Sequence, residues 1–244
     1  MIIHIPHSST FIPPRERDSL LLDQADLEHE LLRLTDWYTD ELFDIPGAYS
    51  VCYPVSRIIT DPERFEDDSD ETAAQYGFGA IYTKTTGGAN LRDHADESRH
   101  DLLERYYRPH HRKLSEAVTR ELKKAGVALI IDAHSYPQDP LPFEPPRYHN
   151  NRVDVCIGTD SFHTPRKLSE ALLESFRAKG YRASINVPFS GSIVPEQYYN
   201  KNPKVKSVMI EINRDLYLLK DSSEKNSHFN QLKEDVSEIL RAIV

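Results

Sequence analysis

The chain has 244 residues, of which 28% are charged and 39% hydrophobic, and its formal net charge is −9 at pH 7. This length and composition are typical of a globular protein with one large domain or two small ones, and they exclude a disordered chain. The acidic balance argues against a nucleic-acid-binding protein, which would present a basic face. It leaves room for a small anionic ligand, because a few arginines in a pocket can dominate locally.

The cysteines and the first residues bear on the compartment. Cys52 and Cys156 lie in apolar, strand-like runs, so the sequence offers no disulfide framework and favours a reducing environment. The opening "MIIHIPHSST" has no basic segment and too short an apolar run for a signal peptide, and no stretch is long enough to span a membrane. The sequence therefore predicts a cytoplasmic protein that binds neither nucleic acid nor membrane.

Short apolar runs alternate with helical patterns along the chain. The runs that predict strands are 2–6, 49–55, 127–133, 153–158, 183–189 and 207–213. The stretches that predict helices include 24–43, 97–125, 165–179 and 225–243. This alternation indicates an α/β sandwich with a mixed or largely parallel sheet. No linker divides the chain, so we expect a single domain over residues 1–244.

Two long segments, 56–96 and 136–152, are polar and rich in turn signals. Loops of this length inside a compact domain are more often functional than idle. We therefore expect both segments to contribute to a functional site.

The predicted helix 24–43 carries an acid among apolar residues. One apolar stripe of this helix is formed by Leu27, Leu31, Leu34, Tyr38 and Leu42. Asp36 lies within a second stripe, on the other side, between Leu32 and Phe43. Because a buried charge is costly unless it is paired, Asp36 is predicted to be either a salt-bridge partner or a metal ligand.

Histidines and acids also occur at three predicted strands. His7 follows the first strand, His134 follows the third, and Glu211 lies in the last. If these strands are neighbours, the three side chains converge with Asp36 at one edge of the sheet. Two histidines and one carboxylate are a common ligand set for catalytic zinc, and the remaining carboxylate would be free to act as a general base. The spacing alone is a weak signal, because no compact motif such as HExxH is present.

A serine hydrolase is the other enzyme class that these residues allow. Ser8, Ser9, Ser135 and Ser190 lie near histidines or glycines. The GxSxG motif of many serine hydrolases is absent, so this reading is the weaker of the two.

Short motifs of a known family occur in order from about residue 2 to about residue 219. They are "HIPHSST", "LTDWYTDELF", "VSRIITDPERFEDD", "GFGAIYT", "YYRPHHRKL", "IIDAHSYP", "VPFSGSIVP" and "IEINRDLYL". On these motifs the chain resembles the N-formylglutamate amidohydrolase family. The fold of that family is similar to that of the zinc carboxypeptidases and the zinc-dependent peptidoglycan amidases. The resemblance implies a three-layer, phosphorylase/hydrolase-like sandwich with helices on both faces of a central mixed, mostly parallel sheet.

The resemblance also assigns roles within the site. By analogy with the zinc enzymes of this fold, His7, Asp36 and His134 would hold one Zn²⁺ per chain, and Glu211 would be the base. Asp132 would then accept the other N–H of His134 and so orient that ligand from behind. The alternative for Asp132 is a turn residue at the end of a strand.

The implied substrate is a small N-acylated acidic amino acid such as N-formylglutamate. Its two carboxylates would need guanidinium partners, for which the motifs favour Arg57 and Arg64, followed by Arg214. His110 would lie near the substrate, or would be a core histidine on an apolar helix face. Ser190 would contact the substrate from a segment that recognises the acyl group.

The sequence departs from the family pattern at Tyr38, where histidine is common, and at Glu63, where asparagine is common. Both departures bear on the substrate more than on the metal. One alternative function is a zinc carboxypeptidase or cell-wall-type amidase that acts on a peptide-like substrate. The other is a non-catalytic binding protein that keeps the fold. The sequence does not indicate the oligomeric state or the pathway.

Overall fold

The computed structural model describes residues 1–93, 95–142, 144 and 152–243, so part of the polar segment 136–152 lies outside the described residues. Within these ranges one sheet has the strand order β2-β1-β3-β6-β4-β5. The strands are β1 (Ile2–Ile5), β2 (Tyr49–Cys52), β3 (Ala128–Tyr136), β4 (Val155–Gly158), β5 (Ala183–Ile185) and β6 (Val205–Asn213). Among these six described strands, only β4 and β6 pair in the antiparallel sense, which confirms a mixed, mostly parallel sheet.

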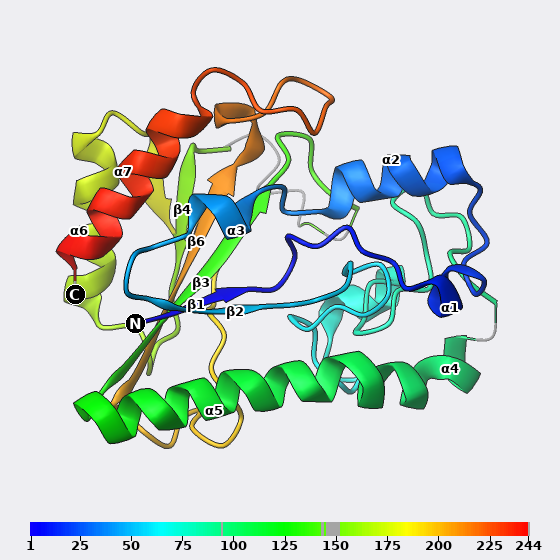
Figure 1. The fold of residues 1–244 in the computed structure, drawn as a ribbon, viewed down its shortest axis with the longest axis horizontal. Coiled ribbons are helices and arrows are strands. Elements are labelled where there is room, and N and C mark those ends of the chain that lie inside the picture. Colours follow the sequence, from blue (N-terminus) through cyan, green and yellow to red (C-terminus); the bar gives the residue numbers. More distant parts are fainter. Residues whose placement is uncertain (94, 143, 145–151, 244) are drawn as a thin grey trace.

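Helices cover both faces of this sheet (Figure 1). The α-helices are α1 (Pro14–Arg17), α2 (Gln24–Leu34), α3 (Thr39–Leu42), α4 (Ala95–Leu102), α5 (Arg108–Ala125), α6 (Arg166–Ala178) and α7 (Phe229–Ala242). Helix α5 runs along one face, while α6 and α7 pack on the other, which confirms the α/β sandwich. Among the described helices, none is both long enough and apolar enough to cross a membrane.

The face of the sheet toward α6 and α7 is an ordinary apolar core. Ile131 of β3 and Ile210 of β6 pack there with Phe176 of α6 and Leu240 of α7, and all four side chains are fully buried. Burying a side chain of this size contributes about 1.5–3 kcal/mol. This layer therefore supplies much of the hydrophobic stabilisation of the sheet.

The opposite face of the sheet is apolar at the start of the strands and polar at their ends. Because successive residues of a strand point to opposite faces, Asp132 and His134 of β3 share one face. Asp132 pairs with Met209 and His134 with Glu211 in the parallel register of β3 and β6. Helix α5 covers the beginning of this face with Leu114, Ala117 and Val118, packed against Ile2, Ala128, Ile130 and Val205. The polar end of the face is left to form a site.

The predicted helix 24–43 is two helices, and the prediction that Asp36 lies on a helix is wrong. Helix α2 ends at Leu34, and α3 begins at Thr39. Between them the backbone N–H of Asp36 donates to the carbonyl of His7 at 3.0 Å. Tyr38 adopts a left-handed conformation with a φ of 60°. This hydrogen bond to the segment that follows β1 takes Asp36 out of the helical path and fixes it beside His7.

Other predicted boundaries also differ, including those of β3 and of the predicted helix 97–125. Strand β3 extends to Tyr136, since β6 pairs with it over its whole length, so His134 lies inside the strand and does not follow it. The predicted helix 97–125 is interrupted by a π-helical turn at Leu103–Tyr107. The turn lies just before Pro109, which lacks the N–H that would continue the regular bonding pattern.

Candidate metal centre and active-site cavity

A cavity of about 390 Å³ lies over the polar ends of β3 and β6. Nine of the ten candidate site residues contribute to its lining, and eight of them are His7, Asp36, Arg57, Arg64, Asp132, His134, Glu211 and Arg214. Ser190 also lines it, within the segment 188–192. Residues far apart in the sequence thus meet at one place, as the proximity of β1, β3 and β6 requires.

Three buried side chains of this cavity face one another closely enough to hold a metal ion. Asp36 Oδ2 lies 3.5 Å from His7 Nδ1 and 3.2 Å from His134 Nδ1. The three ligand atoms all lie within 4.8 Å of one another. Among the described residues, His7 Nδ1 has no hydrogen-bond partner. A buried nitrogen without a partner is costly, and a cation at this position would satisfy it.

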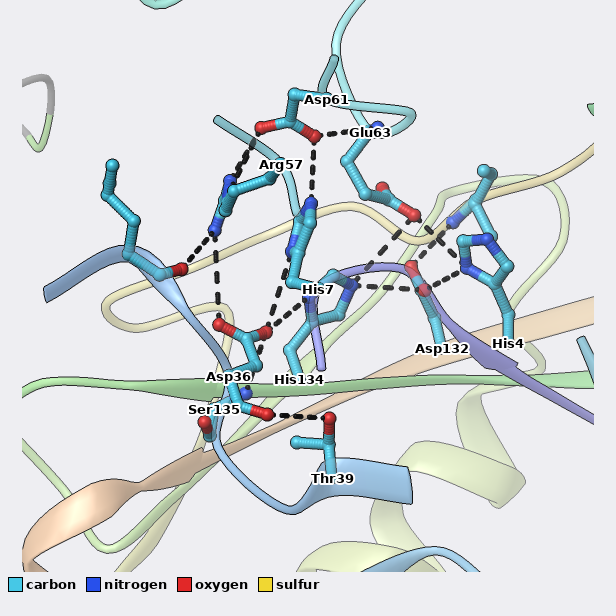
Figure 2. A network of polar contacts seen from close by, with 12 residues as sticks. His4, His7, Asp36, Thr39, Arg57, Asp61, Glu63, Asp132, His134 and Ser135 are labelled. Carbon is cyan, nitrogen blue, oxygen red and sulfur yellow. Dashed lines mark hydrogen bonds and ion pairs between the residues drawn. The ribbon is translucent and has the colours of Figure 1, made fainter. Parts of the chain in front are cut away.

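The far nitrogen of each histidine is held by a separate carboxylate (Figure 2). Nε2 of His7 lies 2.8 Å from Asp61 Oδ1, and Nε2 of His134 lies 3.1 Å from Asp132 Oδ1. An ionised carboxylate only accepts hydrogen bonds, so each Nε2 carries a proton, and with a metal bound each Nδ1 would offer its lone pair as the ligand. Histidine ligands of zinc are oriented in this way. The donor set therefore fits a divalent metal such as zinc.

Asp36 is held in place from several directions. Its Oδ1 accepts a hydrogen bond from Arg214 Nη2 at 2.9 Å, and its Oδ2 accepts one from the Ser135 N–H at 3.1 Å. Burial opposes ionisation of this carboxyl, but its close contacts with the imidazoles of His134 and His7 and the charge of Arg214 outweigh the effect of burial. Together they hold the pKa of Asp36 well below its usual value. The side chain is therefore a fixed carboxylate near neutral pH.

The three candidate arginines differ in their partners. Arg57 donates through Nη2 to Asp61 at 2.7 Å and through Nε to the Tyr82 hydroxyl at 2.9 Å. Arg214 donates a hydrogen bond through Nη2 to Asp36. The side chain of Arg64 is 19% exposed, compared with 8% for Arg57 and 6% for Arg214. Arg64 is therefore the most accessible cation of the three to a ligand in the cavity.

Glu211 lies beside His134 on the neighbouring strand. Its side chain is buried, and Oε2 has no hydrogen-bond partner among the described residues. Burial, reinforced by the nearby charge of Asp36, raises the pKa of this carboxyl to about 8, although His134 opposes the shift. A carboxyl with a pKa near neutrality is suited to take up and release a proton.

His110 lies behind the cavity. Its Nε2 is 2.8 Å from Nε2 of His4, and its ring packs edge-on against Tyr53 at a centroid distance of 4.9 Å. It is not among the described residues that line the cavity. Its hydrogen bond with His4 connects His110 to the site.

Sequence reasoning did not identify Asp61 and gave His4 no specific role, although both belong to the site. Asp61 lies within the motif "VSRIITDPERFEDD", in which only Arg57 and Arg64 were predicted to belong to the site. His4 is a polar residue in an apolar strand, on the face that also carries Asp132 in the neighbouring strand. A histidine within a buried strand, as at position 4, is the sequence feature that could have indicated this role.

Comparison with known proteins places the chain in a family. The sequence profile described as N-formylglutamate amidohydrolase matches residues 1–218. The chain is similar to the N-formylglutamate deformylase of Pseudomonas aeruginosa, at 26% identity over 254 residues that cover 100% of this chain and 89% of the relative. It is also similar to the N-formylglutamate deformylase of Pseudomonas putida, at 23% identity over 253 residues that cover 100% and 90%.

Solved structures share the fold. The crystal structure of N-formylglutamate amidohydrolase from Ralstonia eutropha JMP134 superposes with a TM-score of 0.79 at 23% identity, covering 99% of this chain and 92% of that one. The gene product Atu2144 from Agrobacterium tumefaciens gives a TM-score of 0.63 at 21% identity and covers 100% and 90%. With the profile match over most of its length, the chain belongs to the N-formylglutamate amidohydrolase family.

Proposed function

We propose that this chain is a zinc-dependent amidohydrolase that cleaves the amide bond of a small N-acylated acidic amino acid, with N-formylglutamate as the first candidate substrate. The names of the two Pseudomonas relatives support the reaction and the substrate. The observation that carries the proposal is the arrangement of His7, Asp36 and His134, with Glu211 beside them in one cavity.

The proposed ligands of one Zn²⁺ per chain are His7, Asp36 and His134. A bound Zn²⁺ would polarise the substrate carbonyl and lower the pKa of a water molecule toward about 7. Asp61 and Asp132 hold the two imidazoles so that their Nδ1 lone pairs face the metal position.

Glu211 is the proposed general base. It takes a proton from the water that attacks the carbonyl carbon, and passes that proton to the amide nitrogen as the C–N bond breaks. One water is thus added across the amide, and the products from N-formylglutamate are formate and glutamate. The unpartnered Oε2 of Glu211 and its raised pKa support this role.

The cationic wall of the cavity is proposed to bind the carboxylates of the substrate. Arg64 contacts the substrate directly in this proposal, because its side chain is the most exposed of the three. Arg57 and Arg214 contribute positive charge from positions fixed by Asp61 and Asp36. Ser190, which also lines the cavity, contacts the substrate in this proposal.

The proposal treats residues 1–244 as one catalytic domain, which the continuous six-stranded sheet of the described residues supports. It places the reaction in the cytoplasm, which the two free cysteines, Cys52 and Cys156, support. No nucleic acid or membrane takes part.

Metal content and formate release test the proposal together. We expect about one zinc per chain in the purified protein, its loss in His134→Ala, and its retention in Glu211→Gln. Formate release from N-formylglutamate should fall by about 10²–10⁴-fold in Glu211→Gln, the range that a general base contributes.

Several outcomes would contradict the proposal. The absence of metal from the wild type, even after incubation with zinc, would refute the ligand assignment. Zinc binding with hydrolysis of peptides but not of N-formyl amino acids would favour a carboxypeptidase or cell-wall-type amidase. Zinc binding with no turnover of either class would favour a binding protein.

A further inference from the structure

Behind the proposed metal centre lies a second buried cluster, whose two histidines, His4 and His110, do not line the cavity and have no role in the proposed reaction. Its centre is His4, whose side chain has no exposed surface. Nδ1 of His4 lies 2.8 Å from Asp132 Oδ1 and 3.1 Å from Glu63 Oε1. Its Nε2 lies 2.8 Å from Nε2 of His110. One imidazole thus joins β1, β3 and the segment after β2, as Figure 2 shows. Through His110 it also contacts helix α5.

The direction of these hydrogen bonds follows from the chemistry of the partners. Ionised carboxylates only accept, so Nδ1 of His4 donates to Asp132. The two carboxylates raise the pKa of His4 to about 9, although burial alone would lower it. Burial, together with the charge of His4, lowers the pKa of His110 well below its usual value. A neutral His110 therefore accepts the second N–H of a cationic His4.

Asp132 is shared between the metal centre and the cavity wall. Its Oδ1 contacts both His134 and His4, while its Oδ2 accepts the backbone N–H of Ile193 at 3.0 Å. Ile193 directly follows the segment 188–192, which lines the cavity. The position of this one carboxylate therefore fixes both a proposed ligand and one wall.

The other supporting carboxylate is connected to His4 as well. Asp61 Oδ1 accepts the N–H of Glu63 at 2.9 Å and the Nε2–H of His7 at 2.8 Å. Glu63 in turn contacts His4 through its side chain. His4 is thus linked to the supports of both proposed histidine ligands, directly for His134 and through Glu63 for His7.

We propose that His4, backed by His110, is the positioning residue that holds Asp132 against His134 and thereby sets the metal affinity of the centre. This inference rests on the proposed function, because it takes His134 to be a metal ligand. His4 lies behind the ligand shell and contributes through geometry. Supporting residues of metal ligands typically change metal affinity by about 10–100-fold when they are replaced.

Two substitutions of His4 separate its two contacts. His4→Asn places an amide NH₂ near the position of Nδ1, where it can still donate to Asp132. His4→Gln places the amide near the position of Nε2, where it can still reach His110 but loses Asp132. His163→Asn is a matched control, because His163 is also buried and bonded through both ring nitrogens, but to the backbone of Val205 and Asn200.

The measurement is the zinc dissociation constant of the metal-free protein, titrated against a chromophoric chelator. We expect His4→Gln to weaken zinc binding by about tenfold or more, and His4→Asn to stay within about threefold of wild type. His163→Asn should lower the melting temperature without changing zinc affinity. The visible spectrum of the Co²⁺-substituted protein should shift in His4→Gln, because the orientation of a ligand changes.

The outcomes separate this inference from the proposed function. If the wild type binds no metal, the proposed function fails first. If the wild type binds one zinc and His4→Gln binds it equally well, or if His163→Asn loses as much affinity, only the inference is refuted. Two metals in the wild type and one in His4→Gln would also overturn it, since His4, Glu63 and Asp132 would then hold a second cation.

A second variant covers the case in which His4→Gln does not fold. His110→Phe keeps a ring at position 110 and removes only the acceptor behind His4. We expect a several-fold weaker zinc affinity with the wild-type fold. An unchanged affinity in His110→Phe would overturn the inference.

Discussion

Replacing Glu211 with glutamine should remove activity and, in the metal-free protein, increase stability. The proposed base is a buried carboxyl with an unpartnered oxygen, and burial disfavours its ionised form. Glutamine has nearly the same shape and cannot ionise. The substitution therefore removes the electrostatic cost of a functional group while it keeps the packing of β6 against β3.

The size of the gain follows from the pKa of the folded and unfolded states. Glu211 titrates at about 8 in the folded chain, compared with an ordinary value of 4.5. Between these values the unfolded state binds fewer protons than the folded state, so the free energy of unfolding falls as the pH rises. At 1.36 kcal/mol per pH unit, the cost is about 3 kcal/mol at pH 7 and under about 1 kcal/mol at pH 5.

Urea unfolding of wild type and Glu211→Gln in the presence of a chelator measures this difference. We expect the variant to gain about 2 kcal/mol relative to wild type between pH 5 and pH 7. The comparison between the two pH values cancels any constant cost of the buried amide. A difference in unfolding free energy that is the same at both pH values would refute the reasoning. Added zinc should reduce the gain, because a nearby cation favours the carboxylate.

Three further predictions concern the surroundings of the site. Arg57→Met leaves the carboxylate of Asp61 buried without its main partner, and should lower the free energy of unfolding by about 3–5 kcal/mol in a urea titration. Gly158→Ala forces a Cβ against the side chain of Met209 and the carbonyl of Gly191, both on the cavity lining, so KM should rise and stability should fall by about 1–3 kcal/mol. Zinc affinity should fall as the pH is lowered below neutrality, because protons compete for the imidazole nitrogens; a chelator titration at two pH values measures this.

Matched variants control for the cost of substitution itself. A Cβ at Gly87 would meet only the Thr85 hydroxyl at 3.8 Å, so Gly87→Ala should leave KM and stability unchanged. Arg166 forms an exposed ion pair with Glu170, and Arg166→Met should not move the unfolding midpoint. Equal losses in these controls and in the site variants would contradict the explanation by burial and contact. A zinc affinity independent of pH would contradict the proposed histidine ligands.

Much of the fold could be predicted from local patterns. All six predicted strands are present, because runs of apolar residues bounded by turn signals have few other stable conformations. Their boundaries shifted where a partner strand decided the length, as when β6 extended β3 to Tyr136. The helix 24–43 was predicted as continuous because its apolar periodicity continues through Asp36, and periodicity does not show a backbone hydrogen bond to His7.

The candidate site, too, could be predicted from the sequence only in part. The sequence by itself determined that His134 lies at an apolar strand and that a buried strand carries Glu211, because both follow from the composition of short apolar runs. Only the tertiary structure decided which residues support them. Fifty-four positions separate His7 from Asp61, and 128 separate His4 from Asp132, so no local pattern records either contact. The order of the strands and the course of the loops bring these groups together. Their pairing is favourable because a buried charge without a partner is costly.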